Sequence, residues 1–160
     1  MCNLHQKGLR MTHYVDSLYY EIELTGKYFR FLGTQMFNEL KLDVSVDEFI
    51  VLDIIKTNDK ICQRDIAKLI LKDRANTGRI ITSLEKKELL TRTVDTKNNR
   101  LVKQMKLTQK GEKVLEVSSE YIRNGYKTLT EQISPEEIQK IKETLKNFRE
   151  IMKTIAKPEI

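Results

Sequence analysis

Apolar residues recur at spacings of three and four between residues 14 and 40, which is the period of an amphipathic α-helix. This stripe consists of Val15, Leu18, Ile22, Thr25, Phe29, Leu32, Met36 and Leu40. No proline interrupts it, so the pattern predicts one long helix over residues 14–40. A single helix cannot bury so long a stripe by itself, and we therefore expect it to pack on partner helices.

Three shorter helices are predicted next. Ser45 and Glu48 have the spacing of a capping box at the start of a helix that ends at Asn58-Asp59. A short helix over 63–70 follows, and Asp73 is placed to cap another that runs from residue 74 to about 87. The predicted helix over 74–87 has two unlike faces. Thr77, Ile80, Ile81 and Leu84 form its packing side, and Ala75, Arg79, Thr82 and Lys86 form a small, polar and cationic side.

Alternating residues over 90–94 and 101–107 then predict a β-hairpin, with Asn98-Asn99 suited to the tight turn. Thr108 can cap a long helix to about residue 129, and Ser134 with Glu137 forms the capping box of a last amphipathic helix. The predicted fold is mainly α: a winged helix-turn-helix with a small β-hairpin wing, plus long N- and C-terminal helices that form a dimerisation region. We expect residues 1–44 and 109–160 to dimerise around a DNA-binding region at 45–108, all within one intertwined domain.

The positive charge of the chain is concentrated in its middle third. Residues 60–106 contain 13 Lys or Arg and five Asp or Glu, a net charge of +8, whereas the rest of the chain has a net charge of −2. We call residues 60–106 the basic block. Such a block attracts polyanions, and neutralising phosphates releases their condensed counterions. Its overlap with the short helices and the hairpin favours double-stranded DNA as the partner.

Other functional classes find little support in the sequence. No stretch has the apolar length of a membrane helix and the N-terminus lacks the core of a signal peptide, so we expect a cytoplasmic protein without membrane contact. Cys2, His5 and His13 match no zinc-ligand spacing. With two histidines and no Gly-rich phosphate loop, no catalytic arrangement is credible. We expect neither an enzyme nor a cofactor.

The stretch from Gln63 to Leu115, "QRDIAKLILKDRANTGRIITSLEKKELLTRTVDTKNNRLVKQMKLTQKGEKVL", resembles the bacterial MarR family of transcriptional regulators. The resemblance lies in the helix start "QRDIA", the "KDR" turn, the core of the second short helix, a wing with Asp95 and Arg100, and "LTQKG" at the next helix. It implies an obligate dimer that regulates transcription, usually by repression, and that a small anionic ligand or an oxidant releases from DNA.

The resemblance also implies roles for single residues. Asn76, Thr77 and Arg79 would face the major groove, Arg74 would contact a phosphate, and Arg100 would enter the minor groove with Asp95 bracing it. The residue pattern adds Thr82 on the cationic side of the helix and Lys97 and Asn98 at the hairpin tip, so the expected DNA-binding set is Arg74, Asn76, Thr77, Arg79, Thr82, Lys97, Asn98 and Arg100.

Three residues depart from the family pattern: Glu88 replaces a usual Gly at the end of the second short helix, Gly78 replaces a common Thr, and Cys62 replaces a capping Thr or Ser. Cys62 at a helix N-terminus invites a redox-sensing hypothesis, against which stands a simple replacement of Ser. The main functional hypothesis is a homodimeric, sequence-specific repressor at a palindromic operator, with an effector of unknown identity. The alternative is a winged-helix protein-interaction module, which the cationic, aromatic-free basic block disfavours.

Overall fold

The computed structural model describes residues 13–58, 61–97 and 100–156. It divides into two compact units, Met1–Val46 and Asp47–Ile160. Each unit is described by itself.

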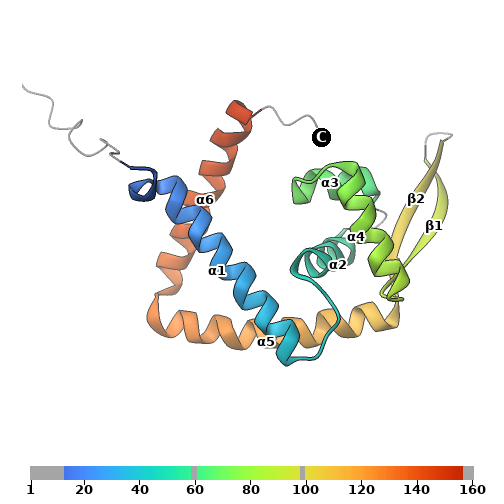
Figure 1. Ribbon diagram of the computed structural model, residues 1–160, viewed down its shortest axis with the longest axis horizontal. Helices are drawn as coiled ribbons and strands as arrows, with labels where there is room; N and C mark the ends of the chain where they lie inside the picture. The colour runs from blue at the N-terminus through green and yellow to red at the C-terminus, as the bar shows by residue number, and fades with distance from the viewer. Residues whose placement is uncertain (1–12, 59–60, 98–99, 157–160) are drawn as a thin grey trace, which may run out of the picture. The chain divides into compact units, whose positions relative to one another are not determined.

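The first unit contains a 3-10 turn, η1 (Tyr14–Asp16), and helix α1 (Leu18–Glu39) (Figure 1). The single helix predicted over 14–40 is interrupted because Ser17 adopts an extended backbone, and its hydroxyl accepts a hydrogen bond from the amide of Tyr20 at 3.1 Å. Serine is a favoured N-cap, so α1 begins after it. Much of the apolar stripe, including Leu18, Phe29 and Leu32, is exposed on the single chain.

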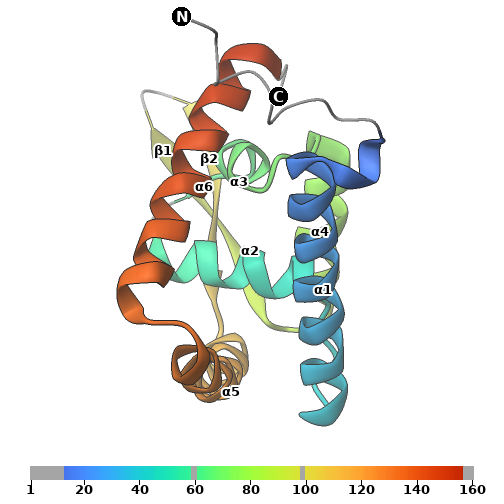
Figure 2. The same cartoon turned by 90° about the vertical axis from the view of Figure 1, so that its left-hand side faces the viewer.

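The second unit has the predicted order of elements (Figures 1 and 2). Its helices are α2 (Val46–Thr57), α3 (Gln63–Ile70), α4 (Arg74–Lys86), α5 (Gln109–Gln132) and α6 (Pro135–Ala156). Strands β1 (Leu90–Lys97) and β2 (Arg100–Leu107) form an antiparallel hairpin between α4 and α5. The fold is therefore a mainly helical winged helix-turn-helix, as the sequence predicted.

A small apolar core lies between α2, α3, α4 and the base of the hairpin. Its most deeply buried side chains are Val51, Leu52, Ile66, Ala67, Ile81, Leu84, Leu89, Leu90 and Met105. The helical period and the strand alternation place these residues on the inner faces of their elements. Because this core holds the inner face of α4, the opposite face of α4 remains exposed to solvent.

Three predicted caps are confirmed. The carboxylate of Asp73 accepts the amide of Asn76 at 2.8 Å at the start of α4, and Thr108 accepts the amide of Gly111 at 3.1 Å at the start of α5. Ser134 and Glu137 form a reciprocal capping box before α6, with bonds of 3.2 and 3.0 Å. These local side-chain bonds set where the helices begin.

The junction between α4 and β1 is a left-handed turn at Glu88, whose φ is 60°. In the family that the sequence resembles, this position is usually a glycine, which adopts a left-handed conformation without steric cost. Glu88 adopts the same conformation although its side chain makes it unfavourable. The carbonyl of Leu89 then accepts the amide of Thr108 at 3.1 Å, and a Cβ on Gly111 would lie 2.1 Å from that same carbonyl oxygen. Position 111 therefore has no room for a side chain, and the base of the hairpin is closed tightly onto α5.

The wing is a hairpin whose register pairs Lys97 with Arg100 and thus leaves two residues for its loop. The two strands lie where the alternation on both sides of Asn98-Asn99 predicted a hairpin. The backbone of β2 is also bridged to Cys62, through Gln104. Over the described residues, no helix has the length and apolar character needed to cross a membrane.

Candidate nucleic-acid interface

Helix α4 has the two unlike faces that its sequence predicts. Thr77, Ile81 and Leu84 are fully buried on the inner face. The hydroxyl of Thr77 donates to the carbonyl of Asp73 at 2.8 Å. The expectation that Thr77 contacts DNA is therefore wrong: the residue packs in the core, as its place in the helical period indicated, and it helps to close the first turn of α4.

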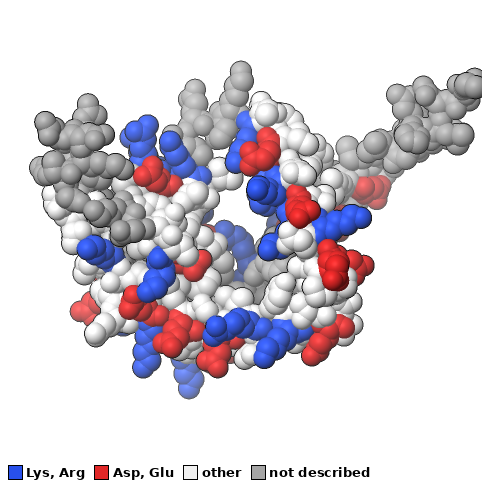
Figure 3. All heavy atoms as spheres, turned by 180° about the vertical axis from the view of Figure 1, so that it is seen from behind, with Lys and Arg blue, Asp and Glu red and all other residues white. Residues whose placement is uncertain are grey.

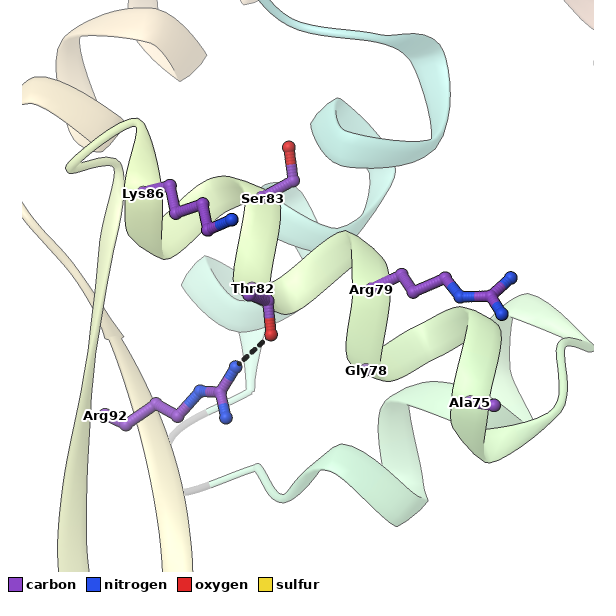
Figure 4. A pocket seen from close by; sticks show the side chains of 7 residues that line it. All are labelled: Ala75, Gly78, Arg79, Thr82, Ser83, Lys86 and Arg92. Atoms are coloured by element: carbon purple, nitrogen blue, oxygen red, sulfur yellow. Dashed lines mark hydrogen bonds between the residues drawn. The ribbon is translucent and has the colours of Figure 1, made fainter.

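The outer face of α4 lines an open groove of about 500 Å³ that is bounded on one side by β1 (Figure 4). We call it the α4 groove. Its lining combines small side chains with long cationic ones and consists of Ala75, Gly78, Arg79, Thr82, Ser83, Lys86 and Arg92. Small residues let a ligand approach the helix backbone closely, while the cations around them attract a negatively charged ligand.

At the N-terminal end of α4, three side chains form a short chain of hydrogen bonds. The amide side chain of Asn76 donates to Asp73, and its oxygen accepts from Nη1 of Arg79 at 3.2 Å. The hydrogen bonds from Asn76, first that of its backbone amide, lower the pKa of the Asp73 carboxyl below its usual value. The acidic N-cap thus orients Asn76, which in turn orients the guanidinium of Arg79.

Arg74 and Arg79 are exposed, as expected for residues that contact a phosphate or a base. The carbonyl of Arg74 accepts a hydrogen bond of 3.0 Å from the side chain of Gln63, at the first turn of α3. Gln63 also lies over Gly78, because a Cβ built there would be 3.0 Å from its amide nitrogen. A threonine at position 78 would displace this glutamine, so the departure from the family pattern has a structural counterpart that no local sequence pattern shows.

Two further side chains that sequence reasoning missed hold α4 from opposite sides. From β1, Arg92 donates through Nη2 to the hydroxyl of Thr82 at 2.9 Å (Figure 4), and its Nε lies 3.3 Å from Glu85. From α2, the buried carboxylate of Glu48 accepts from Ser83 at 2.6 Å and pairs with Lys87 at 2.9 Å. The contacts of Arg92 join residues seven and ten positions apart in the sequence, and those of Glu48 join residues 35 and 39 positions apart.

The expected wing contacts fall where the structure is not described. Asn98 lies outside the described residues, and so do the side chains of Asp95, Lys97 and Arg100. Their DNA contacts remain predictions, supported by the backbone register that places Lys97 and Arg100 at the tip of the hairpin.

Cys62 stands at the N-cap position of α3, but its side chain makes no capping hydrogen bond. Its thiol instead donates to the carboxylate of Asp65 at 3.0 Å. Among the described residues, no group of three His, Cys, Asp or Glu side chains is placed to hold a metal ion. The redox-sensing hypothesis for Cys62 stays untested by this geometry.

Outside the basic block, charges of both signs are mixed. Figure 3 shows Lys and Arg interspersed with Asp and Glu along α5, at the lower edge of the view. In the basic block, several acidic groups are taken up by structural contacts, namely the Asp73 cap, the Glu85 contact with Arg92 and the bond from Cys62 to Asp65. The cations Arg79 and Lys86 remain at the surface of the α4 groove.

Comparisons with known proteins agree with this geometry. Residues 44–102 match the sequence model of the MarR family, and a comparison with curated protein sequences yields no match. A MepR–DNA complex from S. aureus superposes with a TM-score of 0.75 at 22% identity, covering 88% of this chain and 99% of that chain. The transcriptional regulator SlyA has a TM-score of 0.74 at 24% identity, covering 85% and 94% of the two chains.

A MarR/EmrR family transcriptional regulator from Acinetobacter sp. ADP1 has a TM-score of 0.76 at 18% identity, and it covers 85% of this chain and 94% of its own. At such identities the likeness establishes a common fold. The winged-helix region is thus similar to the MarR family, and the fold is shared with these regulators over most of the chain.

Proposed function

We propose that the protein is a dimeric, sequence-specific DNA-binding transcriptional regulator that represses from a palindromic operator. The observation that carries this proposal is the outer face of α4, where exposed cations surround small residues on a helix whose inner face is locked in the core. That the fold is shared with a MepR captured on DNA supports the same role for this chain.

Arg79 is the residue best placed to read a base. Its side chain extends outward from α4 (Figure 4), and within the described part of the chain its Nη1 donates to Asn76. A guanidinium that keeps further N–H groups can donate two parallel hydrogen bonds to O6 and N7 of a guanine in the major groove. Arg74, Lys86 and the wing residues Lys97 and Arg100 would add phosphate and minor-groove contacts.

A second copy of the chain is the proposed partner for the long helices. Their exposed apolar side chains include Leu18, Tyr28, Phe29, Phe31 and Leu32 of α1, Tyr121, Ile122 and Tyr126 of α5, and Ile141, Leu145, Ile151 and Ile155 of α6. So many apolar side chains on a water-soluble regulator would be covered by an interface. A two-fold dimer would present two α4 helices to half-sites about 34 Å apart, which is one turn of DNA.

We further propose that a small ligand or an oxidant releases the protein from its operator, and Cys62 is the residue to test for oxidation. Peroxide should weaken binding by the wild-type protein and leave Cys62→Ser unaffected if this thiol is the sensor. Equal responses of the two proteins would remove Cys62 from consideration.

Selection of bound duplexes from a random pool tests the proposed function. We expect a two-fold palindrome to be enriched, with half-sites separated by about one helical turn. The alternative of a protein-interaction module predicts no enriched sequence. That alternative has little support from the α4 groove, whose lining residues include no aromatic side chain.

A further inference from the structure

Arg92 has no role in the DNA contacts expected from the sequence, yet it forms one wall of the α4 groove (Figure 4). We propose that Arg92 is a positioning residue that fixes the wing against α4, so that the contacts of the wing and of α4 with DNA form together. This proposal rests on the proposed DNA-binding function.

The contacts of Arg92 join β1 to α4, the helix that precedes it in the sequence. Its guanidinium donates a hydrogen bond from Nη2 to the hydroxyl of Thr82 at 2.9 Å, and its Nε lies 3.3 Å from a carboxylate oxygen of Glu85. These two residues are three positions apart and therefore neighbours on one side of α4. A planar, forked guanidinium can span both of them, whereas the single ammonium group of a lysine cannot do so with the same geometry.

Along β1, Arg92 lies where the strand passes from buried to exposed. On the face of β1 that carries it, Leu90 is 1% exposed, the Arg92 side chain is 24% exposed and Val94 is 63% exposed. Arg92 is paired across the hairpin with Met105, which is buried. Among the described residues, it is thus the outermost side chain of β1 that is tied to α4.

The other strand is attached at the same level. Gln104 of β2 is buried, and its backbone is bridged to Cys62 in the segment before α3. Gln104 pairs with Thr93, the immediate neighbour of Arg92. The two attachments hold the hairpin on both strands, one to Cys62 just before α3 and one to α4, so the direction of the projecting wing depends on both.

The charge balance around Arg92 argues for positioning over direct DNA contact. Glu85 lies beside its Nε, and this carboxylate would repel a phosphate that approached the same atom. Nε is buried and has no hydrogen-bond partner among the described residues, so the Glu85 carboxylate is its electrostatic partner. Arg79 and Lys86 in the same groove are instead exposed. Fixing the wing before binding lowers the entropy lost when it enters the minor groove.

The test uses the full-length protein and a duplex enriched from the random pool. Hydroxyl-radical protection that is present with wild type and lost with Arg100→Ala defines the base pairs contacted by the wing. A second duplex is shortened by these base pairs. Affinities for both duplexes are then measured for wild type, Arg92→Lys, Arg92→Met, Thr82→Val/Glu85→Gln and each of these combined with Arg100→Ala.

If Arg92 positions the wing, Arg92→Lys, Arg92→Met and Thr82→Val/Glu85→Gln should each weaken binding to the long duplex by about 5- to 150-fold, the range for losing a specific arginine contact. Arg92→Lys and Arg92→Met should bind the shortened duplex as wild type does, and Thr82→Val/Glu85→Gln should lose less affinity for the shortened duplex than for the long one. Adding Arg100→Ala to any of them should change affinity less than about twofold, because the wing contact is already lost. A general loss of folding would not produce this dependence on duplex length.

Other outcomes would overturn the proposal. If Arg92→Lys binds as wild type while Arg92→Met weakens binding to both duplexes, Arg92 is a phosphate contact and not a positioning residue. If Thr82→Val/Glu85→Gln keeps full affinity for the long duplex, the contacts with α4 do not matter for the wing. A wild-type protein that enriches no duplex would contradict the proposed function itself, and this result is distinct from either of the others.

Discussion

Replacing Lys87 by methionine should reveal how strongly α2 anchors helix α4. The Lys87 ammonium lies 2.9 Å from a carboxylate oxygen of Glu48, and the two side chains are 25% and 6% exposed. Methionine keeps a similar length and removes the positive charge. The carboxylate of Glu48 then stays buried, while its other oxygen still accepts the Ser83 hydroxyl at 2.6 Å.

The expected cost follows from that geometry. Removing one partner of a fully buried ion pair costs about 3–5 kcal/mol, and losing a charged hydrogen bond costs about 1.5–3 kcal/mol. Because Lys87 is partly exposed and the Ser83 bond persists, we expect Lys87→Met to cost about 2–3 kcal/mol. For a chain of 160 residues this corresponds to a fall in Tm of about 4–12 °C.

Thermal unfolding at one fixed protein concentration measures the effect, since a dimer would make Tm depend on concentration. Lys56→Met is the matched control: Lys56 pairs with Glu112 at 2.7 Å, but the two side chains are 56% and 53% exposed. That exposed pair should contribute less than about 1 kcal/mol.

A double-mutant cycle separates the pair from its surroundings. Lys87→Met combined with Glu48→Gln should be at least about 1 kcal/mol less destabilised than the sum of the single variants, because no uncompensated buried charge remains. If Lys87→Met destabilises the protein no more than Lys56→Met, or if the cycle shows no coupling, the anchoring of α4 by Glu48 is refuted.

Three further predictions concern the ends of α4 and α5. Gly111→Ala should destabilise the protein by about 1–3 kcal/mol, because the new Cβ would meet a backbone carbonyl. Gly125→Ala, whose Cβ would have nothing within 4 Å, should stabilise the protein by about 0.5–1 kcal/mol in the same unfolding experiment. Glu88→Gly should raise Tm by a few degrees, since a glycine accepts the φ of 60° without the cost of about 1–2 kcal/mol that a side chain incurs. Hydrogen bonds from Asn76 lower the pKa of the Asp73 carboxyl in the folded protein. The stability that Asp73 contributes is therefore present above its pKa in the unfolded chain and is lost as the pH falls through its pKa in the folded protein. Asp73→Asn should flatten this acid limb of the curve of unfolding free energy against pH.

The sequence predicted those parts of the fold that depend on local chemistry. The helical period and the capping residue Asp73 placed α3 and α4 nearly to the residue, and alternation on both sides of two asparagines predicted the hairpin. The break at Ser17 was missed because the apolar period continues across it, although serine can end as well as join helical segments.

The parts of the site that escaped prediction depend on contacts between distant residues. Glu48 looked like a capping residue of its own helix, and nothing in its neighbourhood in the sequence points to Ser83, 35 positions away. Arg92 looked like one more cation of a basic hairpin. Thr77 was assigned to DNA by resemblance, although its helical position already placed it on the packing side, where the structure buries it.

The most direct test of DNA recognition through α4 is a titration of a selected duplex, followed by fluorescence anisotropy at several salt concentrations. Wild type should lose affinity steeply as salt rises, and Arg79→Ala should bind about 5- to 150-fold more weakly while discriminating less between the selected duplex and a random one. Arg123→Ala, which removes an exposed arginine of α5, should bind as wild type does. If Arg79→Ala instead keeps the affinity and the discrimination of wild type, α4 is not the element that reads the DNA.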